Sequence, residues 1–140
     1  MLADCAPIRD AVLNSIEQVR ADLVNSLSDS GFKVYDFVPE KFVPPCVTVT
    51  AAEGLYLQPG DTFGEWEINL AVYLVVKSGT NQRELREMDA MLCAVLPHFE
   101  GEAGNPWTTL VDAPTYFTIN DKECLGCRIA ASNQFKMTGN

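Results

Sequence analysis

The chain has 140 residues, of which 47% are hydrophobic and 21% charged, and its formal net charge is −9 at pH 7. This length fits a single domain that buries about two-thirds of its unfolded surface. Phosphate neutralisation needs clustered Lys and Arg, so ten dispersed bases against nineteen acids argue against nucleic-acid binding.

The first predicted element is an amphipathic helix over residues 7–29. Pro7 suits its first turn, and Gly31 stands where a C-terminal cap is expected. The apolar residues recur at three- and four-residue steps, the spacing of one helical face. They are Ile8, Val12, Ile16, Val19, Leu23 and Leu27.

Two short strands are predicted next. The first covers residues 32–38 and ends at Pro39, and the second covers 46–51, with Pro44 and Pro45 fixing its entry.

Residues 53–64 are too rich in turn residues for a core strand and too apolar for an ordinary surface loop. We interpret this segment as an extended loop or β-arm between antiparallel strands. The alternative is a loop that folds back on its own domain.

The strongest strand signal covers residues 64–77. One face is apolar from Trp66 to Val76, whereas the other begins polar and becomes apolar at Tyr73 and Val75. The second half of this strand is therefore expected to be buried on both faces.

A second amphipathic helix is predicted from Asn81 to about Leu96, with Asn81 and Glu84 at capping-box spacing and Pro97 ending it. Its expected apolar face consists of Leu85, Met88, Leu92, Val95 and Phe99. A flexible loop is expected over 100–106.

The last two strands are predicted over 107–119 and 124–137, joined by a polar turn at 120–123. Pro114 indicates that the first is interrupted at 112–114. The order α-β-β-β-α-β-β predicts a single α+β domain over 1–140, with a mainly antiparallel or mixed sheet and two helices on one face.

Cys124 and Cys127 have the short spacing of zinc and redox motifs. Residues three apart on a strand point to opposite faces, so the two thiols are not expected to share a metal. The single histidine, His98, has no evident catalytic partner in the sequence. Glu65 and Glu67 resemble a carboxylate pair, but a solvated strand face is the more common cause of this pattern.

These observations predict a protein that is not an enzyme and that has no catalytic residues, cofactor or metal. The five scattered cysteines indicate free thiols in a reducing compartment. No apolar run reaches the roughly 18 residues of a membrane span, and the first residues lack a signal-peptide pattern.

As a whole, the pattern resembles the tail terminator proteins of long-tailed bacteriophages. The resemblance lies in FKVYDFVPE, PPCVTVTA, the strand WEINLAVYLVVK, the turn SGTNQ and the helix RELREMDAMLCAVL, which follow an amphipathic helix and precede two closing strands.

The resemblance implies a virion protein, assembled in the host cytoplasm, that forms a ring, typically a homohexamer, at the head-proximal end of the tail. Such a ring stops tail-tube polymerisation and provides the head–tail joining surface. Its partners are further copies of itself, the tail-tube protein and the head–tail connector protein. DNA passes through without specific binding, and no membrane is involved.

In such a ring, the sheet would form the lumen wall or subunit contacts, and the segment 53–64 would reach a neighbour. Six copies would carry about −54, and a negative lumen would let DNA slide. The candidate subunit-interface residues are Leu55, Tyr56, Leu57, Phe63, Glu65, Glu67 and Trp107.

Two alternatives remain open. One is a neck or head-closure protein of the same virion. The other is a small intracellular ligand-binding domain or enzyme, in which the 53–64 loop would act as a lid.

Overall fold

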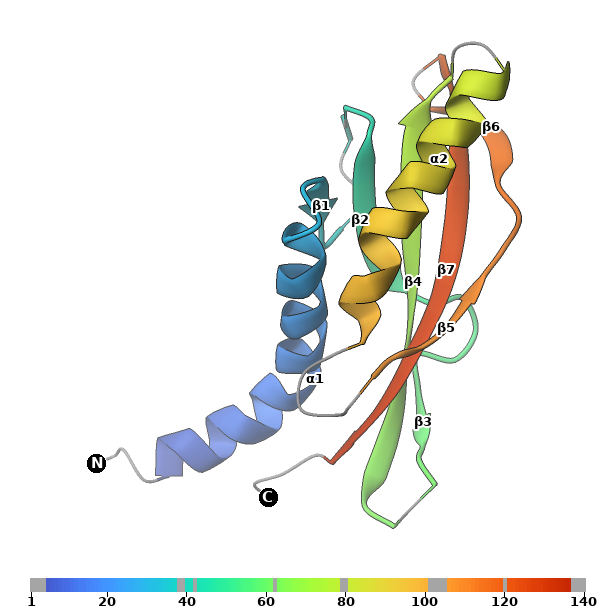
Figure 1. Cartoon of the computed structure of the whole chain (residues 1–140). Coiled ribbons are helices and arrows are strands. Elements are labelled where there is room, and N and C mark those ends of the chain that lie inside the picture. Colours follow the sequence, from blue (N-terminus) through green and yellow to red (C-terminus); the bar gives the residue numbers. More distant parts are fainter. Residues whose placement is uncertain are drawn as a thin grey trace.

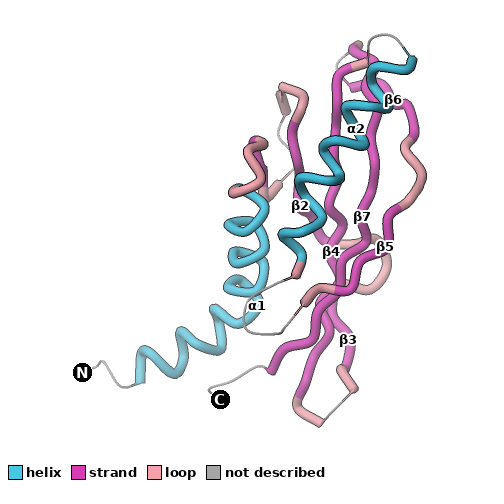
Figure 2. Tube along the Cα trace, viewed as in Figure 1, coloured by secondary structure: helices cyan, strands magenta, loops and turns pink. Residues whose placement is uncertain are grey.

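The computed structural model describes residues 5–37, 40–41, 43–61, 63–78, 81–100, 106–119 and 121–136, and within the two helices it describes side chains from Ile16 and from Arg83 onward. The elements, in chain order, are α1 (Cys5–Ser28), β1 (Lys33–Tyr35), β2 (Cys46–Ala51), β3 (Leu57–Pro59), β4 (Glu65–Lys77), α2 (Asn81–Val95), the 3₁₀ helix η1 (Leu96–Phe99), β5 (Thr108–Val111), β6 (Thr115–Ile119) and β7 (Lys122–Lys136) (Figures 1 and 2).

The strands form one seven-stranded sheet in the order β1-β2-β4-β7-β5, with β3 added to β4 and β6 added to β7. The β1–β2 pair is parallel, and the other pairs are antiparallel. Two helices and a mixed sheet confirm the predicted α+β fold.

The long strands β4 and β7 form the centre of the sheet. They pair along the whole of β4, from Glu65 opposite Lys136 to Lys77 opposite Cys124. Figure 1 shows α2 lying across this pair, while the β3–β4 hairpin extends beyond the end of the helix.

Both helices cover the same face of the sheet. The apolar side of β4 is fully buried there, from Ile68 to Val76, as the alternation predicts. Trp66 is 37% exposed, because it lies on the part of the strand that extends beyond α2. The buried helical residues in this core are Leu23, Leu27, Met88, Met91, Val95 and Phe99.

The opposite side of the sheet is referred to below as the open face. Tyr73 and Val75 of β4 lie on it, together with the residues paired with them. Ala71 and Val75 are buried there and Tyr73 is half-buried, so the prediction of burial on both faces holds for the first two.

The buried face of α2 differs from the predicted one. Leu85 is 48% exposed, whereas Glu84 and Met91 are buried. The stripe that contacts the sheet is therefore rotated, because Glu84 finds hydrogen-bond partners and can face inward.

The end of α2 continues into η1, so Pro97 lies inside a turn of 3₁₀ helix. The Ser26 hydroxyl donates a hydrogen bond to the His98 carbonyl at 3.0 Å, which joins α1 to η1. No helix among the described residues is long and apolar enough to span a bilayer.

Several helix and strand boundaries differ from the predicted ones. β1 is shorter than the predicted strand over 32–38. β7 begins two residues earlier than expected, because Lys122 already pairs with Ile119 of β6. Asp121 has a φ of 65°, which a two-residue hairpin turn requires. The predicted split at 112–114 is confirmed by the gap between β5 and β6. Most of the expected flexible loop lies outside the described residues.

Candidate functional site

The segment 53–64 forms one side of a β-hairpin. Three residues of it make β3, in which Leu57 pairs with Ile68 and Pro59 with Trp66 of β4. The Gly60 N–H donates a hydrogen bond to the Glu65 carbonyl at 2.7 Å. Both expectations are therefore partly met: the segment is an arm, but it is folded back onto its own strand.

The hairpin is also tied to β7 through the Gln134 amide. The Asp61 N–H donates to Gln134 Oε1 at 3.2 Å, and Gln134 Nε2 donates to Asp61 Oδ2 at 3.0 Å. These two bonds fix the loop end of the hairpin relative to the central strands.

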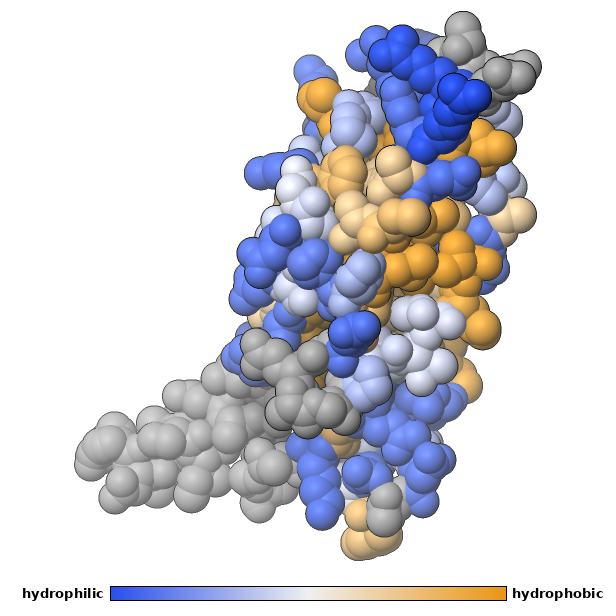
Figure 3. All heavy atoms as spheres, in the orientation of Figure 1, coloured by the Kyte–Doolittle hydropathy of each residue, from blue (hydrophilic) through white to orange (hydrophobic). Residues whose placement is uncertain are grey.

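The four apolar candidates of this segment have different environments. Leu55 is 63% exposed and Phe63 is fully exposed. Tyr56 and Leu57 are half-buried against the main core. An apolar residue projects at the lower end of the molecule in Figure 3, where the hairpin ends in Figure 1.

The carboxylates Glu65 and Glu67 lie on the open face and are half-buried. Glu67 accepts a short hydrogen bond from the Gln58 amide, its cross-strand partner. This bond gives Glu67 a role within the hairpin.

Trp107, the interface candidate that lies outside the segment 53–67, packs against its own domain. The ring is half-buried against the main core, and its backbone N–H donates to the Phe99 carbonyl at 2.8 Å. The exposed apolar residues at this edge are instead Leu110 and Val111 of β5.

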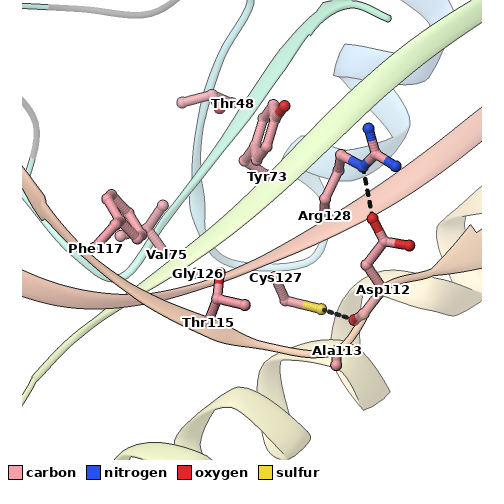
Figure 4. A pocket seen from close by; sticks show the side chains of 10 residues that line it. All are labelled: Thr48, Tyr73, Val75, Asp112, Ala113, Thr115, Phe117, Gly126, Cys127 and Arg128. Carbon is pink, nitrogen blue, oxygen red and sulfur yellow. Dashed lines mark hydrogen bonds and ion pairs between the residues drawn. The ribbon is translucent and has the colours of Figure 1, made fainter. Parts of the chain in front are cut away.

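A cavity of about 490 Å³ opens in the upper half of the open face (Figure 4). Its floor comes from β2, β4 and β7, and its side from β6 and the connection before it. Most of its lining is apolar. The residues around it are Thr48, Tyr73, Val75, Asp112, Ala113, Thr115, Phe117, Gly126, Cys127 and Arg128.

One end of the cavity carries an ion pair. Arg128 Nε donates to Asp112 Oδ2 at 2.8 Å, and this hydrogen bond raises the pKa of Arg128. The Asp112 N–H donates to the Arg128 carbonyl at 2.9 Å, so backbone and side chain hold the two residues together. The ion pair is half-exposed, and most of the remaining lining is apolar.

Four basic side chains lie on strand positions in the upper half of the open face. The register places them on one side of the sheet: Lys33 opposite Cys46, Lys77 opposite Cys124, and Arg128 opposite Tyr73, with Lys122 two residues before Cys124. The strand positions that share this part of the face, from Ala71 to Lys77 and their partners, include no acid.

A polar cluster lies at the other face, where α2 begins. The Ser78 hydroxyl lies 3.3 Å from Glu84 Oε2 and 3.1 Å from Glu123 Oε1, and Glu84 is fully buried. Desolvation, then a hydrogen bond to Glu84, raises the pKa of Tyr116. These contacts anchor the start of α2 to β6 and β7, so the cluster has a structural role.

Cys124 and Cys127 lie on opposite sides of the sheet, as predicted. Cys124 packs with Cys46 and Val75 on the open face, and Cys127 belongs to the main core. Burial raises the pKa of both thiols. Among the described residues, no group of His, Cys, Asp or Glu could hold a metal ion.

Neither the scan against protein-family models nor the search of curated proteins gives a match for this chain.

Proposed function

We propose that this protein forms a ring at the head-proximal end of a bacteriophage tail tube, where it stops tube polymerisation and provides the joining surface for the head connector. The observation that carries the proposal is the β3–β4 hairpin, which extends beyond α2 and bears a fully exposed Phe63. An exposed aromatic side chain at such a tip is suited to binding another protein surface.

The way the hairpin is built supports this proposal. Leu57 packs on the domain core, and Asp61 is bonded to Gln134, so the tip is held in place before any partner binds. A pre-ordered arm loses little conformational entropy on association.

The charge distribution indicates which surface would face a neighbour. A lumen that lets DNA pass needs negative charge, but the upper open face carries four bases. This face therefore suits a subunit contact better than a lumen wall, and the acids that would line a lumen must come from other surfaces.

The two alternatives make different demands. A head-closure protein of the same virion would use similar surfaces but would bind capsid portals. A ligand-binding domain with the 53–64 loop as its lid would need a cavity beneath that loop, whereas the cavity described above is lined by other segments.

Electron microscopy of the protein mixed with purified tail tubes tests the proposal. We expect density at one end of each tube. Binding to capsid portals and not to tubes would favour the head-closure alternative, and uniform decoration or no binding would contradict both.

A further inference from the structure

We propose that Phe63 of one copy inserts into the open-face cavity of a second copy, so that subunits join head to tail. This inference rests on the proposed function, because it specifies the contact between neighbouring subunits of the ring. The partner is a second copy of this chain, and the two contacting surfaces lie at different places on it.

The inserting element is the tip of the β3–β4 hairpin. Phe63 is fully exposed, Gly64 has a φ of 88°, and Gly60 and Asp61 are bonded to their neighbours on β4 and β7. The tip therefore presents an aromatic ring that no described residue covers, next to a hydrogen-bonded base at Gly60 and Asp61.

The receiving element is the cavity of about 490 Å³ on the open face. A cavity of ~150 Å³ in a protein core accommodates benzene, so this one has room for a phenyl ring and the backbone that carries it. Val75, Ala113 and Phe117 provide apolar surface for the ring (Figure 4). Aromatic pairs prefer edge-to-face or offset contacts, which Phe117 could supply.

Charge selects this occupant over other apolar groups. The hairpin segment 57–67 contains Asp61, Glu65 and Glu67 and no Lys or Arg, and one base, Lys136 of β7, lies opposite Glu65. The upper open face contains Lys33, Lys77, Lys122 and Arg128 on its strands.

Three acids act on groups of this face: Asp112, which is bound to Arg128, Glu53, which acts on Arg128 at longer range, and Glu123, which acts on Cys124. The three lysines thus remain to attract an acidic hairpin. Complementary charge of this kind fixes register and speeds association.

Because the hairpin tip and the cavity are different patches, the contact is heterologous. Repeated contacts of this type generate a closed ring when the rotation between subunits closes. In a closed ring, every Phe63 would be buried and every cavity would be filled.

The first experiment measures self-association by sedimentation velocity. Phe63→Asp removes the inserting ring, and Ala113→Trp fills the cavity. We expect each to raise the dissociation constant at least about 30-fold, the size of an interface hot spot. Two control variants should associate like the wild type: Leu85→Asp adds the same charge at a different exposed apolar residue, and Ala113→Ser leaves the cavity open.

The second experiment mixes the two defective variants. Phe63→Asp retains its cavity and Ala113→Trp retains its Phe63, so one intact contact remains between them. We expect a one-to-one dimer that grows no further, while each variant alone stays monomeric. Circular dichroism and urea unfolding check that both variants are folded.

Association unaffected by both substitutions, a mixture that forms no dimer, or a wild type that is monomeric at all concentrations would overturn this contact. So would a co-purified small molecule that native mass spectrometry finds in the wild type and not in Ala113→Trp. Failure of the proposed function is separate: rings that form through this contact but never bind tubes would overturn the function alone. Tubes capped equally well by Phe63→Asp would overturn the contact alone.

Discussion

Gly126 has no room for a side chain, because the ring of Phe117 lies directly over it. A Cβ built at Gly126 would lie 2.4 Å from Phe117 Cε1. The ring thus covers the backbone of β7 and forms one side of the cavity. This close contact also explains why a glycine interrupts a strand that is otherwise rich in side chains that favour β-structure.

We expect Gly126→Ala to destabilise the protein by about 1–3 kcal/mol, because the new methyl group forces the half-buried ring to move. Urea unfolding measures the change. In a Phe117→Ala background the same substitution should cost much less. Equal costs in the two backgrounds would show that the ring is not the obstacle.

The buried thiols make stability depend on pH in the alkaline range. Burial, and then the neighbouring Cys124, raises the pKa of Cys46 from 9.0 to about 11. The unfolded chain loses this proton first, so the contribution is complete below about pH 9 and is lost as the pH rises towards 11.

The urea midpoint should therefore fall between about pH 8.5 and about pH 10.5, and it should fall less steeply in Cys46→Ala. Cys93→Ala is the matched control, because Cys93 is exposed. Some slope should remain from Cys124, Cys127 and Tyr116, whose pKa values are also raised. Identical slopes in wild type and Cys46→Ala would contradict this assignment.

At the scale of elements, the hairpin separates residues that hold the fold from residues that are free for contact. Leu57 is half-buried on the core and Leu55 is 63% exposed, although they are two positions apart. From the sequence, both leucines were predicted to contact a neighbouring subunit.

Leu57→Ala should lower the free energy of unfolding by about 1–2 kcal/mol, whereas Leu55→Ala should change it by less than about 0.5 kcal/mol. Thermal and urea unfolding of the two variants make this comparison. Equal effects would mean that β3 does not pack as described.

Most elements could be predicted from the sequence, because their alternation or helical spacing is regular. The strand over 46–51 has its predicted bounds, the strand over 64–77 has its predicted apolar face, and Pro114 correctly separates two strands. β3 was missed as a strand because three residues that end in a proline carry no periodicity. The packing of Trp107 against the core could not be predicted, because nothing in its local sequence indicates which segments it contacts.

The cavity and the basic face could not be predicted, since both depend on pairing between distant segments. Lys33, Lys77 and Arg128 come from three strands, and only the register brings them to one side of the sheet. Likewise, the cavity exists because β6 returns along β7 with Phe117 beside Gly126.

At the scale of the whole molecule, the net charge of −9 is unevenly distributed. Acids gather on the hairpin and bases on the upper open face. A contact between these surfaces is attractive even though the two copies repel each other overall.

Self-association should therefore respond to salt in a specific way. Raising NaCl from ~50 mM to ~500 mM shortens the Debye length to a few ångströms. Wild-type association should therefore weaken several-fold. Lys33→Gln with Lys77→Gln should weaken association at low salt and reduce this salt dependence. Stronger association of the wild type at high salt would instead indicate that general repulsion dominates.

The central claim is that this protein ends the growth of a tail tube. The most direct measurement adds it to polymerising tail-tube protein and follows tube lengths by electron microscopy. We predict that lengths fall as the ratio of this protein to tube protein rises, and that each arrested tube carries a ring at one end. Tubes that reach the same length at every ratio, with no ring at either end, would contradict the account.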